Sequence, residues 1–239
     1  MYDLLDFDTA LFGYNVAQIK NTLHYTKLPQ LLQELQGHDI RLAYWFVPPT
    51  DAQKNLSAME HSGVFVDVKV VFRTYIKPKA YTSANPRVYR IRGYEGKTPS
   101  RSLLALTMQS GIYSRFATDT HFVHNEFEKL YTTWIEKSVQ HTLGWEVLTY
   151  TDTDGEVKGL ITMESVGKKG KIGLLAVDSA FRGKSIGTAL VKEAFVRFEK
   201  HGIKDVTVTT QKKNVTACKF YESLGFKKVN TENVYHFWL

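Results

Sequence analysis

The stretch Lys171-Ile-Gly-Leu-Leu-Ala-Val-Asp-Ser-Ala-Phe-Arg-Gly-Lys-Ser-Ile-Gly-Thr-Ala-Leu190 decides the fold. It reads as an apolar strand, a basic loop that contains glycine, and the start of a helix. The first turn of a helix leaves about four backbone N–H groups unpaired, and its dipole places roughly half a positive charge there. Gly183 and Gly187 let a phosphate approach the backbone, and Arg182 and Lys184 add full charges. The stretch therefore predicts an anion-binding loop, with an ordinary chain-reversing turn as the alternative.

This loop and the composition exclude several protein classes. The GxxxxGK[ST] pattern of a Walker motif is absent, and the loop does not open the chain as a dinucleotide fingerprint does. The chain has 239 residues, of which 43% are hydrophobic and 23% charged, as in ordinary globular proteins. No apolar run approaches the roughly 18 residues that span a bilayer, and the acidic N-terminus lacks signal-peptide features. The sequence therefore predicts a cytoplasmic protein.

Cysteine and histidine usage argues against a metal centre. Cys218 is the only cysteine, which excludes an intrachain disulfide and any site built on paired cysteines. The eight histidines form none of the usual metal-binding spacings, and no acidic residue separates the closest pair, His121 and His124. The net charge of +7 suits anionic small molecules and nucleic acid equally well. We therefore predict that the protein holds no metal.

Hydrophobic periodicity places two regions on either side of a basic, turn-rich linker at residues 77–87. The Asp-Thr-Asp-Gly sequence at residues 152–155 predicts a hairpin within an antiparallel meander, and residues 171–210 predict a β-α-β crossover. The class is therefore α/β (α+β). The predicted helices are 24–35, 51–62, 99–109, 125–140, 185–201 and 214–224, and the predicted strands are 40–47, 64–76, 144–150, 157–164, 171–177, 205–210 and 234–239.

A weak internal echo links the two regions. In each, a strand is followed by an Asn-x-x-Ala sequence, a glycine and a further strand. The alanine-to-glycine spacing is shorter in the first copy, which also has no tyrosine that matches Tyr221. The first region is thus either a degenerate copy of the second or an unrelated α/β unit. The motif positions are Asn55, Ala58 and Gly63 in the first copy, and Asn214, Ala217 and Gly225 in the second.

Two motifs in this order resemble the GNAT superfamily of acyl-CoA-dependent N-acyltransferases. The signature [RQ]-x-x-G-x-[GA] is matched by Arg182-Gly-Lys-Ser-Ile-Gly187, in which Ser185 replaces the first glycine. The second signature is matched by Asn214-x-x-Ala217-x-x-x-Tyr221-Glu-x-x-Gly225-Phe226. The resemblance implies a GNAT fold with a central mixed, mostly antiparallel sheet flanked by helices. Residues 87–239 would form its acetyl-CoA-binding catalytic domain, and residues 1–86 a smaller N-terminal α/β domain that resembles a degenerate half-GNAT.

The resemblance also implies direct transfer of an acetyl group from acetyl-CoA to an amine. Tyr221 is then the general acid for the departing thiolate, and Asn214 bonds the pantetheine arm. Helical spacing puts both on one face with Cys218, so a core tyrosine and a nucleophilic cysteine are the alternatives. The implied coenzyme contacts are the backbone of Leu175, Ala176 and Val177 at the acyl oxygen and pantetheine, and Arg182, Gly183, Lys184, Ser185, Ile186, Gly187 and Thr188 around the pyrophosphate.

Short segments over most of the chain resemble the bacterial TDP-fucosamine acetyltransferases, which N-acetylate a nucleotide-linked 4-amino-4,6-dideoxy sugar. The resemblance implies acetyl-CoA and a nucleotide sugar as partners, and a homodimer fits the family. The implied acceptor site is Ser114, Arg115, Phe116, Asp119 and His121, of which the last two are also candidates for a general base. The segments are Asp8-Thr-Ala-Leu-Phe-Gly-Tyr14, Ser114-Arg-Phe116, Leu130-Tyr-Thr-Thr-Trp-Ile135, Ile172-Gly-Leu-Leu-Ala-Val177, Thr210-Gln211 with Asn214, and Tyr235-His-Phe-Trp-Leu239.

The sequence leaves three other functions open. The chain could acetylate a protein N-terminus, a lysine, a polyamine or an antibiotic amine, although cationic acceptors usually need an acidic groove. It could bind acyl-CoA without turnover, because Ser185 departs from the motif. A nucleic-acid-binding module is disfavoured, because the sequence shows neither a basic helix nor an RNP-like aromatic pattern.

Overall fold

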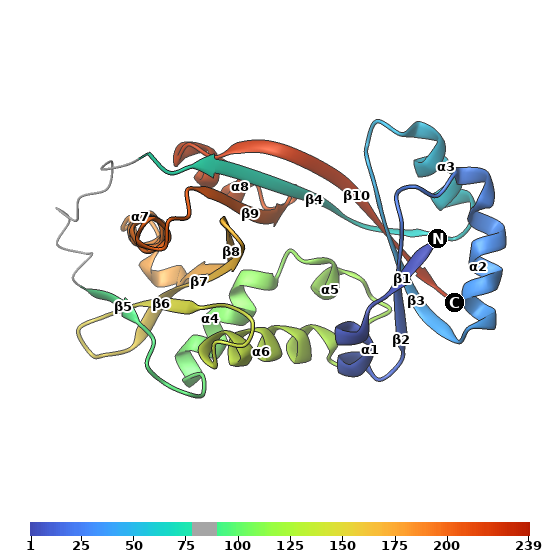
Figure 1. Cartoon of the computed structure of the whole chain (residues 1–239). Coiled ribbons are helices and arrows are strands. Elements are labelled where there is room, and N and C mark those ends of the chain that lie inside the picture. Colours follow the sequence, from blue (N-terminus) through green and yellow to red (C-terminus); the bar gives the residue numbers. More distant parts are fainter. Residues whose placement is uncertain (78–89) are drawn as a thin grey trace.

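A ten-stranded sheet runs through the computed structural model, which describes residues 1–77 and 90–239 (Figure 1). Its strand order is β1-β2-β3-β10-β4-β9-β8-β7-β6-β5. Among the described strands, the pairings β2–β3 and β8–β9 are parallel and the others are antiparallel, which confirms the predicted mixed, mostly antiparallel sheet. The predicted linker, apart from residue 77, and the predicted boundary between residues 86 and 87 lie outside the described residues.

The predicted elements of the second half all occur in the predicted order, but β10 begins at Lys227, seven residues before its predicted start, and the short elements β5 and α5 were not predicted. β6, β7 and β8 form the predicted antiparallel meander, and β8, α7 and β9 form the predicted parallel crossover. The elements are β5 (Ile91–Gly93), α4 (Arg101–Gly111), α5 (Arg115–Thr118), α6 (Glu126–Val139), β6 (Glu146–Thr151), β7 (Val157–Val166), β8 (Lys169–Val177), the 3-10 helix η3 (Ser179–Phe181), α7 (Ile186–Lys200), β9 (Asp205–Gln211), α8 (Val215–Ser223) and β10 (Lys227–Trp238).

The first half contains three elements that the sequence did not predict, all within residues 1–23. They are short: α1 ends at Gly13, which has φ 79°, and the strands on either side of it pair with each other. Short elements carry little periodicity, which is why the pattern missed them. The elements of this half are β1 (Tyr2–Leu4), α1 (Asp6–Phe12), β2 (Asn15–Ile19), the 3-10 helix η1 (Tyr25–Lys27), α2 (Leu28–Gly37), β3 (Ile40–Val47), α3 (Ala52–Glu60) and β4 (Val64–Tyr75).

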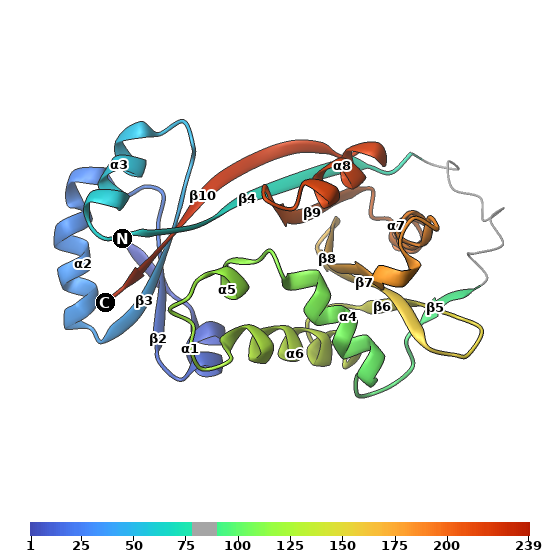
Figure 2. The ribbon, with the colours of Figure 1, turned by 180° about the vertical axis from the view of Figure 1, so that it is seen from behind.

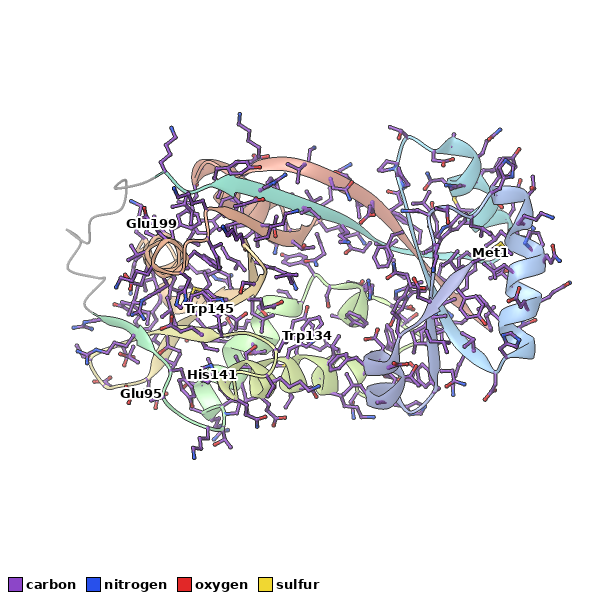
Figure 3. All side chains as sticks on the ribbon, in the orientation of Figure 1. Met1, Glu95, Trp134, His141, Trp145 and Glu199 are labelled. Atoms are coloured by element: carbon purple, nitrogen blue, oxygen red, sulfur yellow. The ribbon has the colours of Figure 1, made fainter. Side chains whose placement is uncertain are left out.

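Helices cover both faces of β6–β8 (Figure 2). Leu160 of β7 packs in the cluster under α4 and α6, and the next residue, Ile161, packs in the cluster under α7. This alternation is expected for a strand that is buried on both faces. Figure 3 shows Trp134 on the α6 side and Trp145 on the α7 side, where Trp145 contacts Phe198 at a ring distance of 5.6 Å.

The two halves exchange strands. β10, the last strand of the chain, lies between β3 and β4 of the first half, and β4 lies between β10 and β9 of the second half. Tyr235 and Phe237 of β10 belong to the core under α2, while Val70 and Phe72 of β4 belong to the core under α7. Each half therefore completes the sheet and the core of the other.

The two halves are also copies of one unit. Adding 163 to the bounds of α3 (Ala52–Glu60) gives those of α8 (Val215–Ser223), and the same shift turns β4 (Val64–Tyr75) into β10 (Lys227–Trp238). The echo in the sequence is therefore a structural repeat, although its alignment differs from the predicted one. Asp51, and not Asn55, occupies the N-cap position that Asn214 has in the second copy, so Ala58 takes the place of Tyr221.

The pairing of β4 with β10 is symmetric about Lys69 and Glu232, which lie opposite each other. These two residues are equivalent under the shift of 163, and so are the two residues that the ladder skips, Val66 in β4 and Val229 in β10. An approximate two-fold axis therefore passes through the Lys69–Glu232 pair.

The copies differ between the first parallel strand and the helix that follows it. In both, the parallel pairing ends at equivalent positions, Ile19 opposite Trp45 and Ile172 opposite Val208. β8 then continues to Val177 and leads into a loop before α7, whereas β2 ends at Ile19. The first copy thus lacks a counterpart to the end of β8.

Candidate active site

The candidate site lies where β8 and β9 stop pairing. Beyond Ile172 and Val208 the two strands no longer pair with each other, although β8 still pairs with β7 and β9 with β4, and β8 shows a register shift against β7 at this point. The hydroxyl of Thr162 accepts the hydrogen bond that Leu174 N–H donates, at 2.8 Å, and so satisfies the backbone there. Bulges of this kind occur next to active sites, because they open or redirect a strand.

A pocket of about 450 Å³ occupies this opening. Both sequence motifs contribute to its walls, one from the loop before α7 and the other from α8. Lys184 is not among the lining residues, and its Nζ lies 4.5 Å from the ring centroid of Phe181. The predicted residues that line the pocket are Leu175, Ala176, Val177, Arg182, Gly183, Ser185, Ile186, Gly187, Thr188, Asn214 and Tyr221.

The loop before α7 and the first turn of that helix form part of the pocket wall. Gly183 has φ 74° and Ser185, the N-cap of α7, has φ 57°, so two of the four residues between η3 and α7 are left-handed. A left-handed residue at the cap explains the glycine that the motif prefers at position 185. Arg182 Nε donates to the carbonyl oxygen of Val177 at 3.1 Å, which joins the loop to the end of β8. The geometry fits the predicted anion-binding loop.

Helix α8 brings Asn214 and Tyr221 to the opposite wall. Asn214 is the N-cap, and its Oδ1 accepts from the N–H of Ala217 at 3.1 Å, which leaves its amide NH₂ to donate elsewhere. Tyr221 is buried beside Phe72, Phe220 and Phe226, and burial raises the pKa of its phenol. The phenol is therefore fully protonated at neutral pH.

Cys218 does not line the pocket. Its Sγ lies 3.7 Å from the carbonyl oxygen of Gln211, and burial raises the pKa of its thiol. These features are those of a half-buried structural cysteine rather than of a nucleophile.

Gly187 sits close to the opposite wall. A Cβ at this position would lie 3.3 Å from Cζ of Phe220 and 3.7 Å from Cγ2 of Val177. Because all three residues line the pocket, any side chain at position 187 would narrow it.

The five predicted acceptor residues do not line this pocket, but they begin next to it. Ile112 and Tyr113 form part of its wall, and Ser114 and Arg115 follow at the start of α5. The guanidinium carbon of Arg115 lies 4.2 Å from the ring centroid of Tyr44 and 4.4 Å from that of Phe116, so the cation is stacked between aromatic rings.

Asp119 and His121 form a hydrogen-bonded cluster with the C-terminal strand. Asp119 accepts from the Nδ1 of His121 at 2.8 Å, from the Nδ1 of His236 at 2.6 Å and from Trp238 Nε1 at 3.0 Å. Burial raises the pKa of Asp119, but these hydrogen bonds outweigh it and hold the pKa below its usual value. The carboxylate is saturated by its own neighbours, and its observed contacts tie α5 to β10.

The sequence missed several residues of this region. Gln109, Ile112 and Tyr113 line the pocket outside both motifs, and Phe220 lines it from a variable position of the second motif. Asp67 is buried nearby, and the one available signal was that it is the single acidic residue in the predicted strand 64–76. Within residues 1–77 and 90–239, no group of three or more potential ligands could hold a metal ion. None of the described helices is long and apolar enough to cross a membrane.

Parts of the chain are similar in sequence to an N-alpha-acetyltransferase and to a polysaccharide biosynthesis protein. It is 39% identical to N-alpha-acetyltransferase 30 of Xenopus laevis over 72 residues, which are 30% of this chain and 26% of that protein. It is 25% identical to the spore coat polysaccharide biosynthesis protein SpsD of Bacillus subtilis over 139 residues, which are 58% of this chain and 47% of that protein. The chain thus spans less than half the length of these curated relatives.

A comparison with solved structures and a family match point to the same group of proteins. The chain superimposes on a GCN5-related N-acetyltransferase from Sphaerobacter thermophilus with a TM-score of 0.62 and 14% identity, covering 99% of this chain and 75% of that one. Residues 112–226 match the acetyltransferase (GNAT) family, and this match contains both motifs and most of the pocket wall. The chain as a whole therefore has the GNAT fold, and residues 112–226 carry its similarity to the GNAT acetyltransferase family.

Proposed function

We propose that this protein is an acetyl-CoA-dependent N-acetyltransferase that acts on the amine of a nucleotide-linked amino-deoxy sugar of the TDP-4-amino-4,6-dideoxyhexose type. The observation that carries the transferase part is the pocket in which the α7 loop and the α8 face meet. One wall offers helix N-terminal N–H groups to a pyrophosphate, and the other offers a protonated phenol. A site for phosphate and a proton donor in one pocket suit an acyl-CoA thioester.

The proposed roles follow the geometry of the two walls. Backbone groups of Leu175, Ala176 and Val177 bind the acyl oxygen and the pantetheine arm, because the end of β8 has no strand partner on the β9 side. A backbone N–H directed at the acyl oxygen stabilises the negative charge that develops there as the amine attacks. The pyrophosphate is held by the pocket-lining residues Arg182, Gly183, Ser185, Ile186, Gly187 and Thr188. Lys184 lies outside the lining and adds a positive charge to the same loop.

Tyr221 and Asn214 complete the proposed machinery. The amine nitrogen bonds to the thioester carbonyl carbon, the carbon–sulfur bond breaks, and the Tyr221 phenol gives its proton to the departing thiolate. The free amide NH₂ of Asn214 holds the pantetheine arm, while its Oδ1 caps α8.

The nucleotide-sugar acceptor rests on two observations. One is the similarity to the spore coat polysaccharide biosynthesis protein, which extends over 58% of this chain. The other is the half-buried, ring-stacked Arg115, whose buried Nε has no hydrogen-bond partner among the described residues. A stacked cation with a free donor suits a phosphate group next to a planar base. Ser114, Phe116, Asp119 and His121 would surround the acceptor. The expectations of a cytoplasmic location and of a homodimer stay predictions.

A protein N-terminus is the second candidate acceptor, because the chain is 39% identical to an N-alpha-acetyltransferase over 72 residues. Thiol release from acetyl-CoA separates the two. We expect release with TDP-4-amino-4,6-dideoxygalactose and none above background with an N-terminal peptide, a lysine peptide, spermidine or an aminoglycoside. Release with a peptide alone would keep the transferase and overturn the sugar acceptor.

A further inference from the structure

Asp67 is a buried carboxylate that the proposed mechanism does not yet use. It lies on β4 directly after Val66, the residue that the ladder with β10 skips. A skipped residue of this kind turns the following side chain away from the regular alternation. Asp67 is 4% exposed, and its Oδ1 has no hydrogen-bond partner among the described residues. A buried oxygen without a partner is costly, so its presence calls for an explanation.

Asp67 does not itself line the pocket, but it lies between two chain segments that lead into the pocket wall. On one side, Val68 O accepts a hydrogen bond from Lys212 N–H at 2.8 Å, and Asn214, two residues on, lines the pocket. On the other side, Thr118 of α5 approaches the carbonyl oxygen of Val66 at 3.4 Å, and the residues before α5 line the pocket. An acceptor that enters beside these segments would pass Asp67 on its way to a thioester held in the pocket.

The groups that face Asp67 leave it available to a ligand. They are Arg115 of α5, Lys213 before α8 and Tyr131 of α6, and none of them forms an ion pair or hydrogen bond with it in the described structure. Burial raises the pKa of Asp67 to about 6, against the lowering effects of the Val68 N–H and of both cations. The carboxylate is therefore mostly ionised at neutral pH and close to the working range of a general base.

We propose that the Asp67 carboxylate binds the acceptor amine and takes the proton that the amine loses during acetyl transfer. This inference rests on the proposed N-acetyltransferase function. As the new carbon–nitrogen bond forms and the carbon–sulfur bond breaks, one nitrogen proton moves to Asp67 while the Tyr221 proton moves to sulfur. Water then carries the proton from Asp67 back to the Tyr221 phenolate, so the enzyme is regenerated and the products are the amide and the free thiol.

The repeat supplies an independent argument for this assignment. The residue equivalent to Asp67 in the second copy is Asn230, which follows the skipped Val229 and is exposed. The same backbone device thus carries a carboxylate only on β4, the strand that the first copy inserts beside β9 and the pocket. The first copy has no loop like the one before α7, so a base at the equivalent position on β10 would have no coenzyme-binding loop beside it.

The test compares Asp67→Asn with Asn230→Asp, which places a carboxylate at the equivalent position of the other copy. We expect Asp67→Asn to lower kcat/KM for the amine at pH 7 by about a hundredfold or more. The acidic limb of the wild-type profile near pH 6 should vanish, and the remaining activity should rise with pH towards the amine's own pKa. The Kd for acetyl-CoA should stay within about twofold, and Tm should not fall, because a buried unpaired charge is removed. Asn230→Asp should match the wild type in all four readouts.

Other outcomes overturn the proposal. An Asp67→Asn variant with a wild-type pH profile, or with kcat/KM within about threefold of wild type, excludes the base. A fall in Tm together with weaker acetyl-CoA binding assigns Asp67 a structural role instead. If the wild-type protein binds acetyl-CoA but none of the tested amines causes thiol release, the proposed N-acetyltransferase function is wrong, and the assignment of Asp67 as its base is wrong with it. Thiol release with unchanged Asp67→Asn kinetics removes only the base.

Discussion

Lys69 and Glu232 occupy equivalent positions in the two copies and bind each other across the approximate two-fold axis, with 2.9 Å between Nζ and Oε2. Around this pair the copies exchange their long strands: Phe237 packs in the core of the first half and Phe72 in that of the second. The region that matches the family, residues 112–226, contains neither exchanged strand. The unit that folds is therefore larger than the unit that the family match outlines.

The first prediction is that residues 90–239 expressed alone do not fold. The fragment lacks β4, so β9 and β10 lose the strand between them and the core loses Val70 and Phe72. Circular dichroism and denaturant unfolding should show no cooperative transition, and co-expression with residues 1–77 should restore one. A fragment that unfolds cooperatively and binds acetyl-CoA by itself would contradict this dependence.

The sequence predicted the second half well and the first half in part. The long strands 40–47 and 64–76 were predicted nearly to the residue, because apolar periodicity over many residues is a strong signal. The exchange of β4 and β10 could not be predicted, since pairing partners far apart in sequence leave no local pattern. The alignment of the repeat also failed, because Asn55 resembled Asn214 in type while Asp51 matched it in position.

The same division holds for the candidate site. The proposed coenzyme side lies on two continuous segments with fixed spacing, so motifs were enough to predict that Gly187, Asn214 and Tyr221 lie together in one pocket. The proposed acceptor side is assembled from β4, α5 and the residues before α8, and only tertiary structure brings these together. For that reason the sequence did not indicate Asp67. It did indicate Asp119, but not that His236 donates a hydrogen bond to the Asp119 carboxylate.

The second prediction concerns Tyr221→Phe. The change removes the phenol hydroxyl but keeps the ring that packs against Phe72 and Phe226, so the fold should persist. We expect kcat to fall at least about tenfold, because the thiolate loses its proton donor, while the Kd for acetyl-CoA stays nearly constant. Steady-state kinetics and calorimetric titration check both values. An unchanged kcat would remove Tyr221 from the mechanism.

The third prediction concerns Gly187→Glu. The new side chain would start 3.3 Å from Phe220 and place a negative charge where the pyrophosphate is expected. We expect no measurable acetyl-CoA binding in a titration, with a cooperative unfolding transition retained. Gly37→Ala is the matched control, because its Cβ meets no atom within 4 Å and its helix is far from the loop before α7. Normal binding by Gly187→Glu would refute the anion-binding loop.

The fourth prediction concerns His236 and the pH dependence of stability. Burial lowers the pKa of His236 to about 4, although Asp119 opposes this, and its Nε2 has no partner among the described residues. Between about pH 6.5 and 4, this histidine is therefore protonated in the unfolded chain but neutral in the folded protein. As a result, the free energy of unfolding falls as the pH falls through this window, by up to about 1.4 kcal/mol per pH unit. Asp67, whose pKa is raised, has the opposite effect below pH 6, because the folded protein takes up its proton before the unfolded chain does.

Urea unfolding should therefore show that the free energy of unfolding falls more steeply with falling pH in Asp67→Asn than in wild type. A flat profile in Asp67→Asn would mean that His236 is already charged in the folded state.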